Sequence, residues 1–187
     1  LLRQGQVNME ERRRLAAKGF QHVAYYDNVI AHYMDQKEGI FGEHITLGLR
    51  KVLDLRYGEN PHQKGAFYAE EIFPAVPGLA TAKQHNGPSL SFNNILDLDS
   101  AANVVWDFEA PTIAIIKHNN PCGLSSNSDL SEAYRRALTG DPVAAFGGVV
   151  GSNRNIDITA AREIDKTHYD CIIAPSFSQE ALTLLGR

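Results

Sequence analysis

Apolar residues recur at spacings of three and four between residues 9 and 36, and charged residues occupy the opposite positions. This period is typical of an amphipathic helix, so the pattern predicts one helix over this segment. After a break at residues 37–42, Ile45, Leu47 and Leu49 alternate with Thr46, Gly48 and Arg50. Alternation with a period of two predicts a half-buried strand.

The second half of the chain alternates short apolar runs with helical patterns. The apolar runs at 112–116, 143–151 and 171–174 predict buried strands, and the polar segment 117–123 predicts a loop. Helices are predicted at 129–138, at 157–166 and from Ser178 onward, because each begins at a side chain that can cap it. This order favours an α/β layered fold with a partly parallel sheet, whose ligands would lie beyond the strand ends.

Composition narrows the function classes. The chain has 187 residues, of which 43% are hydrophobic and 21% charged, as expected of one globular domain with or without an appended helix. With 18 Lys and Arg against 22 Asp and Glu, the net charge of −4 argues against nucleic-acid binding. No apolar run is long enough to cross a bilayer and no signal segment begins the chain, so we expect a cytoplasmic protein without membrane contact.

Lys117 and His118 directly follow the apolar run at 112–116, with Asn119 and Asn120 next. An imidazole can transfer a proton near neutral pH, and an ammonium can stabilise charge that develops on an oxygen. The segment therefore predicts a catalytic site at a strand end. A polar strand end with a Pro-Gly turn explains the same residues equally well.

Three further groups offer binding chemistry. Arg56 presents a planar fork suited to phosphate or carboxylate, and Tyr57 adds a donor or a stacking face. Phe146 and Gly147 could accept a stacked base, and Asp170 could hold an amine or a ribose. The alternatives are a self-satisfied turn at 56–63, a bulge in a core strand and an ordinary strand cap.

Zinc chemistry is disfavoured. A zinc nucleobase deaminase needs an HxE element and a PCxxC element. Here Asn120 stands in the place of the catalytic glutamate after His118, and Ser125 in the place of the second cysteine after Cys122. The two cysteines, Cys122 and Cys171, form no CxxC and are expected to be free thiols.

Four segments together, KHNNPCG, LRYGENPHQKGAFY, SFNNILDLDSA and AAFGGVVGSN, closely resemble the AICAR transformylase family. This is the folate-dependent part of a bifunctional purine biosynthesis enzyme that also carries IMP cyclohydrolase. The resemblance implies a zinc-free, cytidine-deaminase-like α/β lobe preceded by an N-terminal helix. It also implies formyl transfer from 10-formyltetrahydrofolate, as co-substrate, to the 5-amino group of 5-aminoimidazole-4-carboxamide ribonucleotide (AICAR).

The same resemblance implies roles for individual residues. His118 would transfer the proton, and Lys117 would act on the formyl donor or on the developing oxyanion. The substrate-binding positions that it implies are Arg56, Tyr57, Asn119, Phe146, Gly147 and Asp170.

The resemblance further implies that residues 1–42 form a helical linker and residues 43–187 the first transformylase lobe. We expect the chain to be a piece of a longer protein, without the cyclohydrolase domain and homodimeric when whole. Two alternatives remain open: a non-catalytic nucleotide-binding module and, with less support, a zinc nucleobase deaminase.

Overall fold

The computed structural model of the protein describes residues 7–34, 43–70 and 77–186. The chain divides into two compact units, of which one comprises Leu1–Lys51 with Tyr68–Ala75 and the other Val52–Phe67 with Val76–Arg187. The predicted division into 1–42 and 43–187 stays a prediction.

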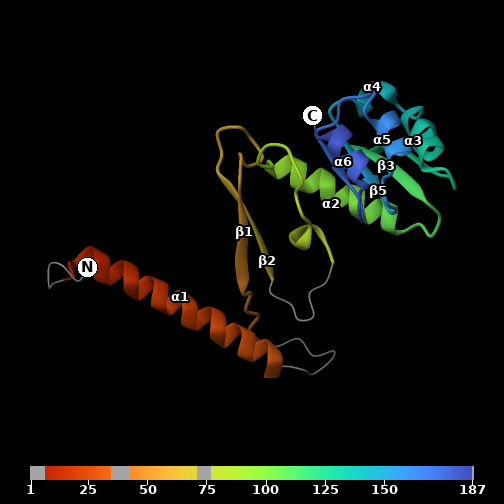
Figure 1. The fold of residues 1–187 in the computed structure, drawn as a ribbon. Coiled ribbons are helices and arrows are strands. Elements are labelled where there is room, and N and C mark those ends of the chain that lie inside the picture. The colour runs from red at the N-terminus through yellow and green to blue at the C-terminus, as the bar shows by residue number, and fades with distance from the viewer. Residues whose placement is uncertain (1–6, 35–42, 71–76, 187) are drawn as a thin grey trace. The chain divides into compact units, whose positions relative to one another are not determined.

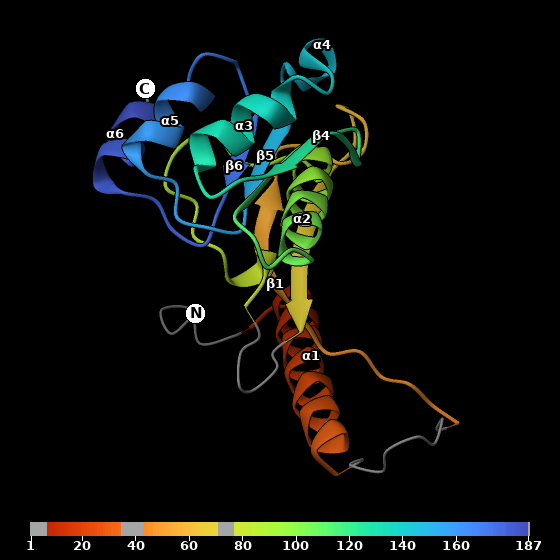
Figure 2. The same ribbon diagram turned by 90° about the vertical axis from the view of Figure 1, so that its right-hand side faces the viewer.

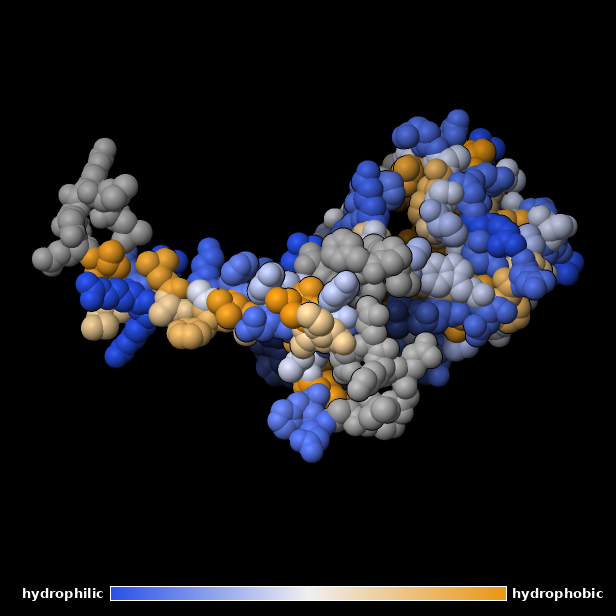
Figure 3. All heavy atoms as spheres, turned by 90° about the horizontal axis from the view of Figure 1, so that it is seen from below, coloured by the Kyte–Doolittle hydropathy of each residue, from blue (hydrophilic) through white to orange (hydrophobic). Residues whose placement is uncertain are grey.

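The first unit contains the helix α1, Met9–Met34. Its start agrees with the sequence pattern, and the Asn8 side chain accepts a hydrogen bond of 2.8 Å from the Glu11 amide there. The predicted last residues, 35 and 36, lie outside the described residues. None of the helix's residues is buried, and Phe20 is 78% exposed. Figure 3 shows apolar and polar side chains together on the surface of this helix.

The strand predicted from the alternation at residues 45–49 is wrong in its position. Strand β1 is Leu49–Leu55, and Ile45 and Leu47 lie before it with exposed side chains. The backbone at Thr46 is engaged by α1 instead, because its carbonyl lies 2.9 Å from His32 Nε2 and its hydroxyl accepts a 2.6 Å bond from Asn28. An alternating apolar pattern is therefore not enough to form a strand where another element bonds to the backbone.

Strand β1 and strand β2, Gly65–Glu70, form a two-stranded sheet whose arrows point in opposite directions in Figure 2. The boundary between the two units falls within both strands. The connection between them satisfies its own polar groups: Gly58 donates to the Gln63 carbonyl at 2.9 Å, and the Asn60 amide donates to the Gln63 side chain at 2.8 Å. Gly58 is buried at the base of this turn.

A four-stranded sheet forms the centre of the second unit. Its strands are β3 (Thr112–Lys117), β4 (Asn120–Ser126), β5 (Val149–Ser152) and β6 (Cys171–Ile173), in the order β4-β3-β5-β6. Strand β3 is antiparallel to both neighbours, whereas β5 and β6 are parallel. The predicted partly parallel sheet is therefore confirmed.

Two predictions in this unit are wrong. The supposed loop at 117–123 is a tight hairpin, because β4 pairs back onto β3 directly after a two-residue turn. The supposed strand at 143–151 is strand only from Val149 to Ser152 in β5, preceded by the short helix α4, Pro142–Ala145. Asp141 caps that helix by accepting bonds from the amides of Val143 and Ala144, which stops the apolar run from extending as a strand.

Helices cover the two faces of this sheet, as seen in Figure 1. The elements are the short 3₁₀ helix η1 (Leu79–Thr81), α2 (Phe92–Trp106), α3 (Leu130–Leu138), α5 (Ile158–Ile164) and α6 (Gln179–Leu185). Helices α3, α5 and α6 start at the predicted caps, Asp129, Asp157 and Ser178. The likeness of this layered unit to cytidine deaminase stays a prediction.

Alternate residues of β3 point to opposite faces, as a pleated strand requires. Ile113 and Ile115 pack with α3, α5 and α6, whereas Ala114 and Ile116 pack with α2. Glycine lets α2 approach the sheet closely, because a Cβ at Gly151 would lie 2.8 Å from the Ala101 carbonyl oxygen. Each face of the sheet therefore has its own apolar core.

Candidate functional site

The sheet topology brings three chain segments together at one edge. In the strand register Ile116 pairs with Val149, and Val149 pairs with Cys171. Because β3 runs against β5 and β6, the carboxyl end of β3 lies beside the residues that precede β5 and β6. Lys117, Gly147 and Asp170 are therefore neighbours, although about 50 residues separate the first from the last.

The Lys117 ammonium is held by backbone carbonyls. Its Nζ donates to the Gly147 carbonyl at 2.7 Å and to the Phe146 carbonyl at 3.1 Å. An ammonium has three N–H donors, so one remains for a bound molecule. Gly147 has a φ of +66°, and a Cβ there would lie 3.2 Å from Lys117 Nζ, so glycine suits both the backbone and the space.

The Asp170 carboxylate also lies beside Gly147, because a Cβ there would be 3.8 Å from its Oδ1. It accepts a long bond of 3.5 Å from the Asn94 side chain, and its second oxygen lies 3.9 Å from His168 Nε2. Half of the Asp170 side chain is exposed, at 49%, so the carboxylate can still receive a donor from a ligand. The Phe146 ring is 63% exposed and stands 5.4 Å from the His168 ring, centroid to centroid.

Arg56 and Tyr57 form a pair where β1 ends. The Arg56 guanidinium carbon lies 5.1 Å from the centre of the Tyr57 ring, a cation–π distance. Backbone bonds fix both residues against the segment that leads into α2, because the Arg56 amide donates to the Leu90 carbonyl and the Phe92 amide to the Tyr57 carbonyl. The Arg56 guanidinium thus remains available to an anion.

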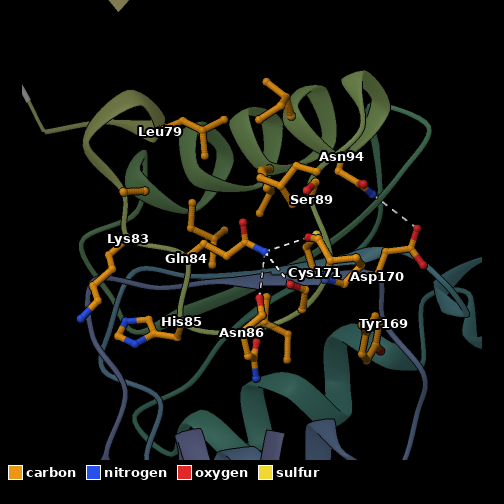
Figure 4. Close-up of a pocket in the computed structure, with 18 of the residues that line it drawn as sticks. Leu79, Lys83, Gln84, His85, Asn86, Ser89, Asn94, Tyr169, Asp170 and Cys171 are labelled. Atoms are coloured by element: carbon orange, nitrogen blue, oxygen red, sulfur yellow. Dashed lines mark hydrogen bonds between the residues drawn. The ribbon is translucent and has the colours of Figure 1, made fainter. Parts of the chain in front are cut away.

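A cavity of about 540 Å³ opens beside this edge within the second unit. Arg56, His168 and Asp170 line one part of it, while Leu79, Ile95 and Leu98 give it an apolar wall. In Figure 4 the Asn94 side chain points toward Asp170. The cavity therefore offers a cation and an anion beside an apolar surface, which suits a small polar ligand with a flat ring.

The loop that closes the cavity is shaped by Gln84. Its side-chain amide nitrogen donates to the carbonyls of Asn86 at 2.9 Å and Pro88 at 2.8 Å, as Figure 4 shows. Lys83 and His85 flank it on the cavity wall. The Gln84 side chain therefore holds the loop in one conformation, which suits a loop that contributes to a binding site.

His118 and Asn119 make the two-residue turn of the β3–β4 hairpin. Both have positive φ, 52° and 64°. The Asn119 amide donates to Asp97 of α2 at 2.6 Å, and the Ser100 hydroxyl donates to the Asn119 side-chain oxygen. The His118 side chain is exposed and has no hydrogen-bond partner among the described residues.

The two cysteines are protonated thiols in this environment. Burial raises the pKa of Cys171 to about 11, with a further contribution from the negative charge of Asp170. Burial also raises the pKa of Cys122, whose thiol donates to the Ile115 carbonyl at 3.4 Å. Within the described ranges, no three His, Cys, Asp or Glu side chains gather as candidate metal ligands.

The structure unites part of the predicted site. Lys117, Phe146, Gly147 and Asp170 meet at one edge, and Arg56 shares the cavity with Asp170. Tyr57 contacts this group through Arg56. His118 and Asn119 stand on the adjoining hairpin and contact none of the other predicted site residues through a hydrogen bond or ion pair within the described ranges.

Sequence reasoning missed the contribution of α2. Its residues Asn94, Asp97 and Ser100 reach Asp170 and Asn119 from one side of the helix. Their spacing of three places them near one helical face, which was the available signal. The signal was weak, because Asn93, Asp99 and Asn103 of the same helix are polar as well.

Comparison with known proteins decides the family. The family model described as "AICARFT/IMPCHase bienzyme" matches residues 1–187. This chain belongs to the AICARFT/IMPCHase family. Proteins called "Bifunctional purine biosynthesis protein PurH" from Bacillus mycoides (strain KBAB4) and Bacillus cereus (strain AH187) are each 46% identical to it over 182 residues.

These matches cover 97% of the chain but 35% of each relative. The chain thus spans about a third of the length of these curated AICARFT/IMPCHase relatives. A protein of the same name from Bacillus anthracis (strain CDC 684 / NRRL 3495) shows the same identity and coverage. In the part of the chain that the structure describes, no helix is long and apolar enough to cross a membrane.

Proposed function

We propose that these residues belong to the AICAR formyltransferase half of a bifunctional enzyme of purine biosynthesis. The substrates would be AICAR and 10-formyltetrahydrofolate. The observation that carries the proposal is the Lys117 ammonium, which is held on two carbonyls beside Asp170 in a chain of this family. The resemblance supports two further parts of the proposal, a homodimeric whole protein and a cytoplasmic location.

The reaction makes one bond and breaks another. The 5-amino group of AICAR attacks the formyl carbon, and the bond from that carbon to the N10 nitrogen of the folate breaks. The amine is a weak nucleophile, since its lone pair is conjugated with the ring and the carboxamide. It must lose a proton as it attacks, and the departing folate nitrogen must gain one.

Our proposal gives each step to a side chain at the described edge. The His118 imidazole takes the proton from the amine and gives it to the departing folate nitrogen, since it is exposed and carries no hydrogen bond that would block it. Lys117 directs its remaining N–H toward the oxygen of the formyl group, where negative charge develops. A positive charge already fixed in place needs little reorganisation when the transition state forms.

The substrate would lie in the adjoining cavity. Arg56 suits the phosphate of the nucleotide, because a guanidinium can donate two parallel bonds to phosphate oxygens. Asp170 suits an amine or hydroxyl donor of the same molecule. Gly147 lies beside Asp170 and the Phe146 ring beside His168 of the cavity wall, where both would contact the aminoimidazole. Tyr57 supports Arg56 from below its plane.

The test uses the natural protein that carries these residues. His118→Ala should lower the rate of formyl transfer by about 100- to 10,000-fold, and Lys117→Met by about 100- to 1,000-fold. The measurement is the absorbance change as tetrahydrofolate forms, at saturating AICAR. Lys166→Met is the matched control, since that exposed lysine is paired with Glu163 at 2.7 Å and lies outside the site.

Turnover that persists in His118→Ala would contradict the role of the imidazole. The alternative function, a non-catalytic binding module, predicts a different result. That reading requires calorimetry to show that AICAR binds to the wild-type protein while no formyl transfer occurs under the same conditions. Stoichiometric zinc in the purified protein would instead revive the deaminase reading.

A further inference from the structure

The turn that carries His118 has an unusual backbone. His118 and Asn119 are the only non-glycine residues with positive φ among those that the structure describes. A left-handed backbone is unfavourable for residues with a Cβ, because the Cβ comes close to the following carbonyl oxygen. A two-residue hairpin turn requires this backbone at both positions and usually carries Asn, Asp or Gly there. Since the first position here is a histidine, contacts from outside help to stabilise the turn.

Helix α2 supplies these contacts. Asp97 accepts the Asn119 amide proton at a donor–acceptor distance of 2.6 Å, which is short for such a bond and typical of one with a charged acceptor. One turn further along the helix, Ser100 donates to the Asn119 side chain. Both residues lie on a helix that apolar packing fixes against the sheet through Leu98 and Ala101. The turn is therefore tied to a rigid element at Asn119.

The His118 side chain receives no such support. Within the described ranges, its imidazole makes no hydrogen bond, and the His118 carbonyl accepts a 3.0 Å bond from the Asn120 side chain in the same hairpin. The backbone of the turn sets the direction of the His118 Cα–Cβ bond, from which the imidazole extends. The contact that fixes the neighbouring amide therefore also fixes the position from which the imidazole reaches the site.

We propose that Asp97 is a positioning residue, which holds the His118–Asn119 turn so that the imidazole faces the reacting amine. This inference rests on the proposed function, in which His118 transfers the proton. Asp97 does not touch the substrate in this arrangement. It acts through the Asn119 amide, and Ser100 assists it at the Asn119 side chain.

The experiment compares three variants of the natural protein that contains these residues. Asp97→Ala removes the acceptor, and Asp97→Asn keeps an oxygen in the same place without the charge. Asp99→Ala is the matched control, because that carboxylate is two residues away on the same helix and accepts a 3.1 Å bond from Asn103. The measurements are kcat, the KM for AICAR, and the NMR signal of the Asn119 amide after labelling with isotope-enriched asparagine.

The expected results separate positioning from a general loss of structure. Asp97→Ala should lower kcat about ten- to 100-fold with little change in KM, because a misplaced catalytic group costs rate and leaves substrate binding intact. The Asn119 amide proton should move upfield as its short bond is lost. Asp97→Asn should restore most of kcat, and Asp99→Ala should match the wild type in all three measurements.

An unchanged kcat in Asp97→Ala, with the amide signal moved, would overturn the inference. So would an amide signal that does not move at all. If His118→Ala also retained full turnover, the proposed function would fail first. In that case the amide signal alone decides whether Asp97 holds the turn, so the two failures are distinguishable.

Discussion

The two faces of the central sheet are built for different tasks. The face covered by α3, α5 and α6 is closed by apolar side chains, with Tyr134 buried and bonded to Tyr169 at 3.0 Å. The face covered by α2 has a smaller apolar core around Leu98, Ala101 and Val105. Polar side chains on the same helix leave that core and reach the strand ends.

Helix α2 contributes both to packing and to the candidate site. On α2, Leu98 and Ala101 face the sheet, while Asp97 and Ser100 lie one position before each of them. Successive helical residues are separated by about 100° around the axis, so the two sets point in adjacent directions. The side of α2 next to its packed face thus bonds to a backbone amide at the hairpin turn, and this bond marks a nearby candidate site.

The strongest test of this contrast is a cavity in the closed face. Ile115→Ala should lower the free energy of unfolding by about 2–5 kcal/mol, because a fully buried side chain is truncated in a packed core. Urea denaturation measures this effect. Under the proposed function, the affinity of the folded protein for AICAR should stay unchanged, since Ile115 points away from α2.

Val143→Ala is the control for this change, because that side chain is 85% exposed and its loss should leave stability near the wild-type value. A large loss of AICAR affinity in folded Ile115→Ala would show that the two faces are not independent.

The cysteines offer a second test, because one lies with each core: Cys122 packs against the closed face and Cys171 against the α2 face. Burial raises the pKa of Cys171 from 9.0 to about 11, so its thiolate at pH 8 is about 100-fold scarcer than that of an ordinary cysteine. Labelling with iodoacetamide, followed by mass spectrometry, should be slower by a similar factor in the native protein than in urea.

Bound AICAR should slow the labelling of Cys171 further and leave Cys122 unchanged, because only Cys171 lines the cavity. Equal protection of both thiols would contradict this. The folded-state pKa of Cys171 is the higher one, so ionisation favours the unfolded chain. Its contribution to stability should therefore be complete below pH 9 and decline as the pH rises toward 11.

The smallest expected effect comes from a helix cap on the closed face. Asp157→Ala should lower the free energy of unfolding by about 1 kcal/mol, because Asp157 accepts hydrogen bonds from the Thr159 and Ala160 amides. Thermal unfolding measures it. Asp165→Ala, at the other end of the same helix, lacks such bonds and serves as the control. A loss of the proposed formyl-transfer activity in folded Asp157→Ala would contradict the independence of the two faces.

Much of the fold was predictable where local rules act alone. The start of α1, the caps at Asp129, Asp157 and Ser178, and the buried strand at 112–116 follow from period and capping chemistry. The predicted elements were misplaced where another part of the chain forms hydrogen bonds with the backbone. Thr46 bonds to His32 and Asn28 of α1 where a strand was predicted, and residues 120–123 of the predicted loop belong to β4, which pairs with β3.

The candidate site was predictable in its residue types and less so in its assembly. The family resemblance and the chemistry of their side chains marked Lys117, Gly147 and Asp170, although local patterns alone left structural alternatives open. The register of β3, β5 and β6 made them neighbours. The signal of Asp97 was weaker, because an acidic residue on a helix is most often a solvated one. Its role depends on the amide that lies across from it in space.

The sequence by itself determined the family, the helix starts, the buried core of β3 and the residues able to carry chemistry, since these depend on side-chain identity and short-range spacing. Tertiary structure alone decided that β3 runs against β5 and β6, and that α2 lies over the hairpin turn. These choices depend on which distant backbone groups pair and which apolar faces meet. Such long-range contacts place the Lys117 ammonium beside Gly147 and tie the turn that carries His118.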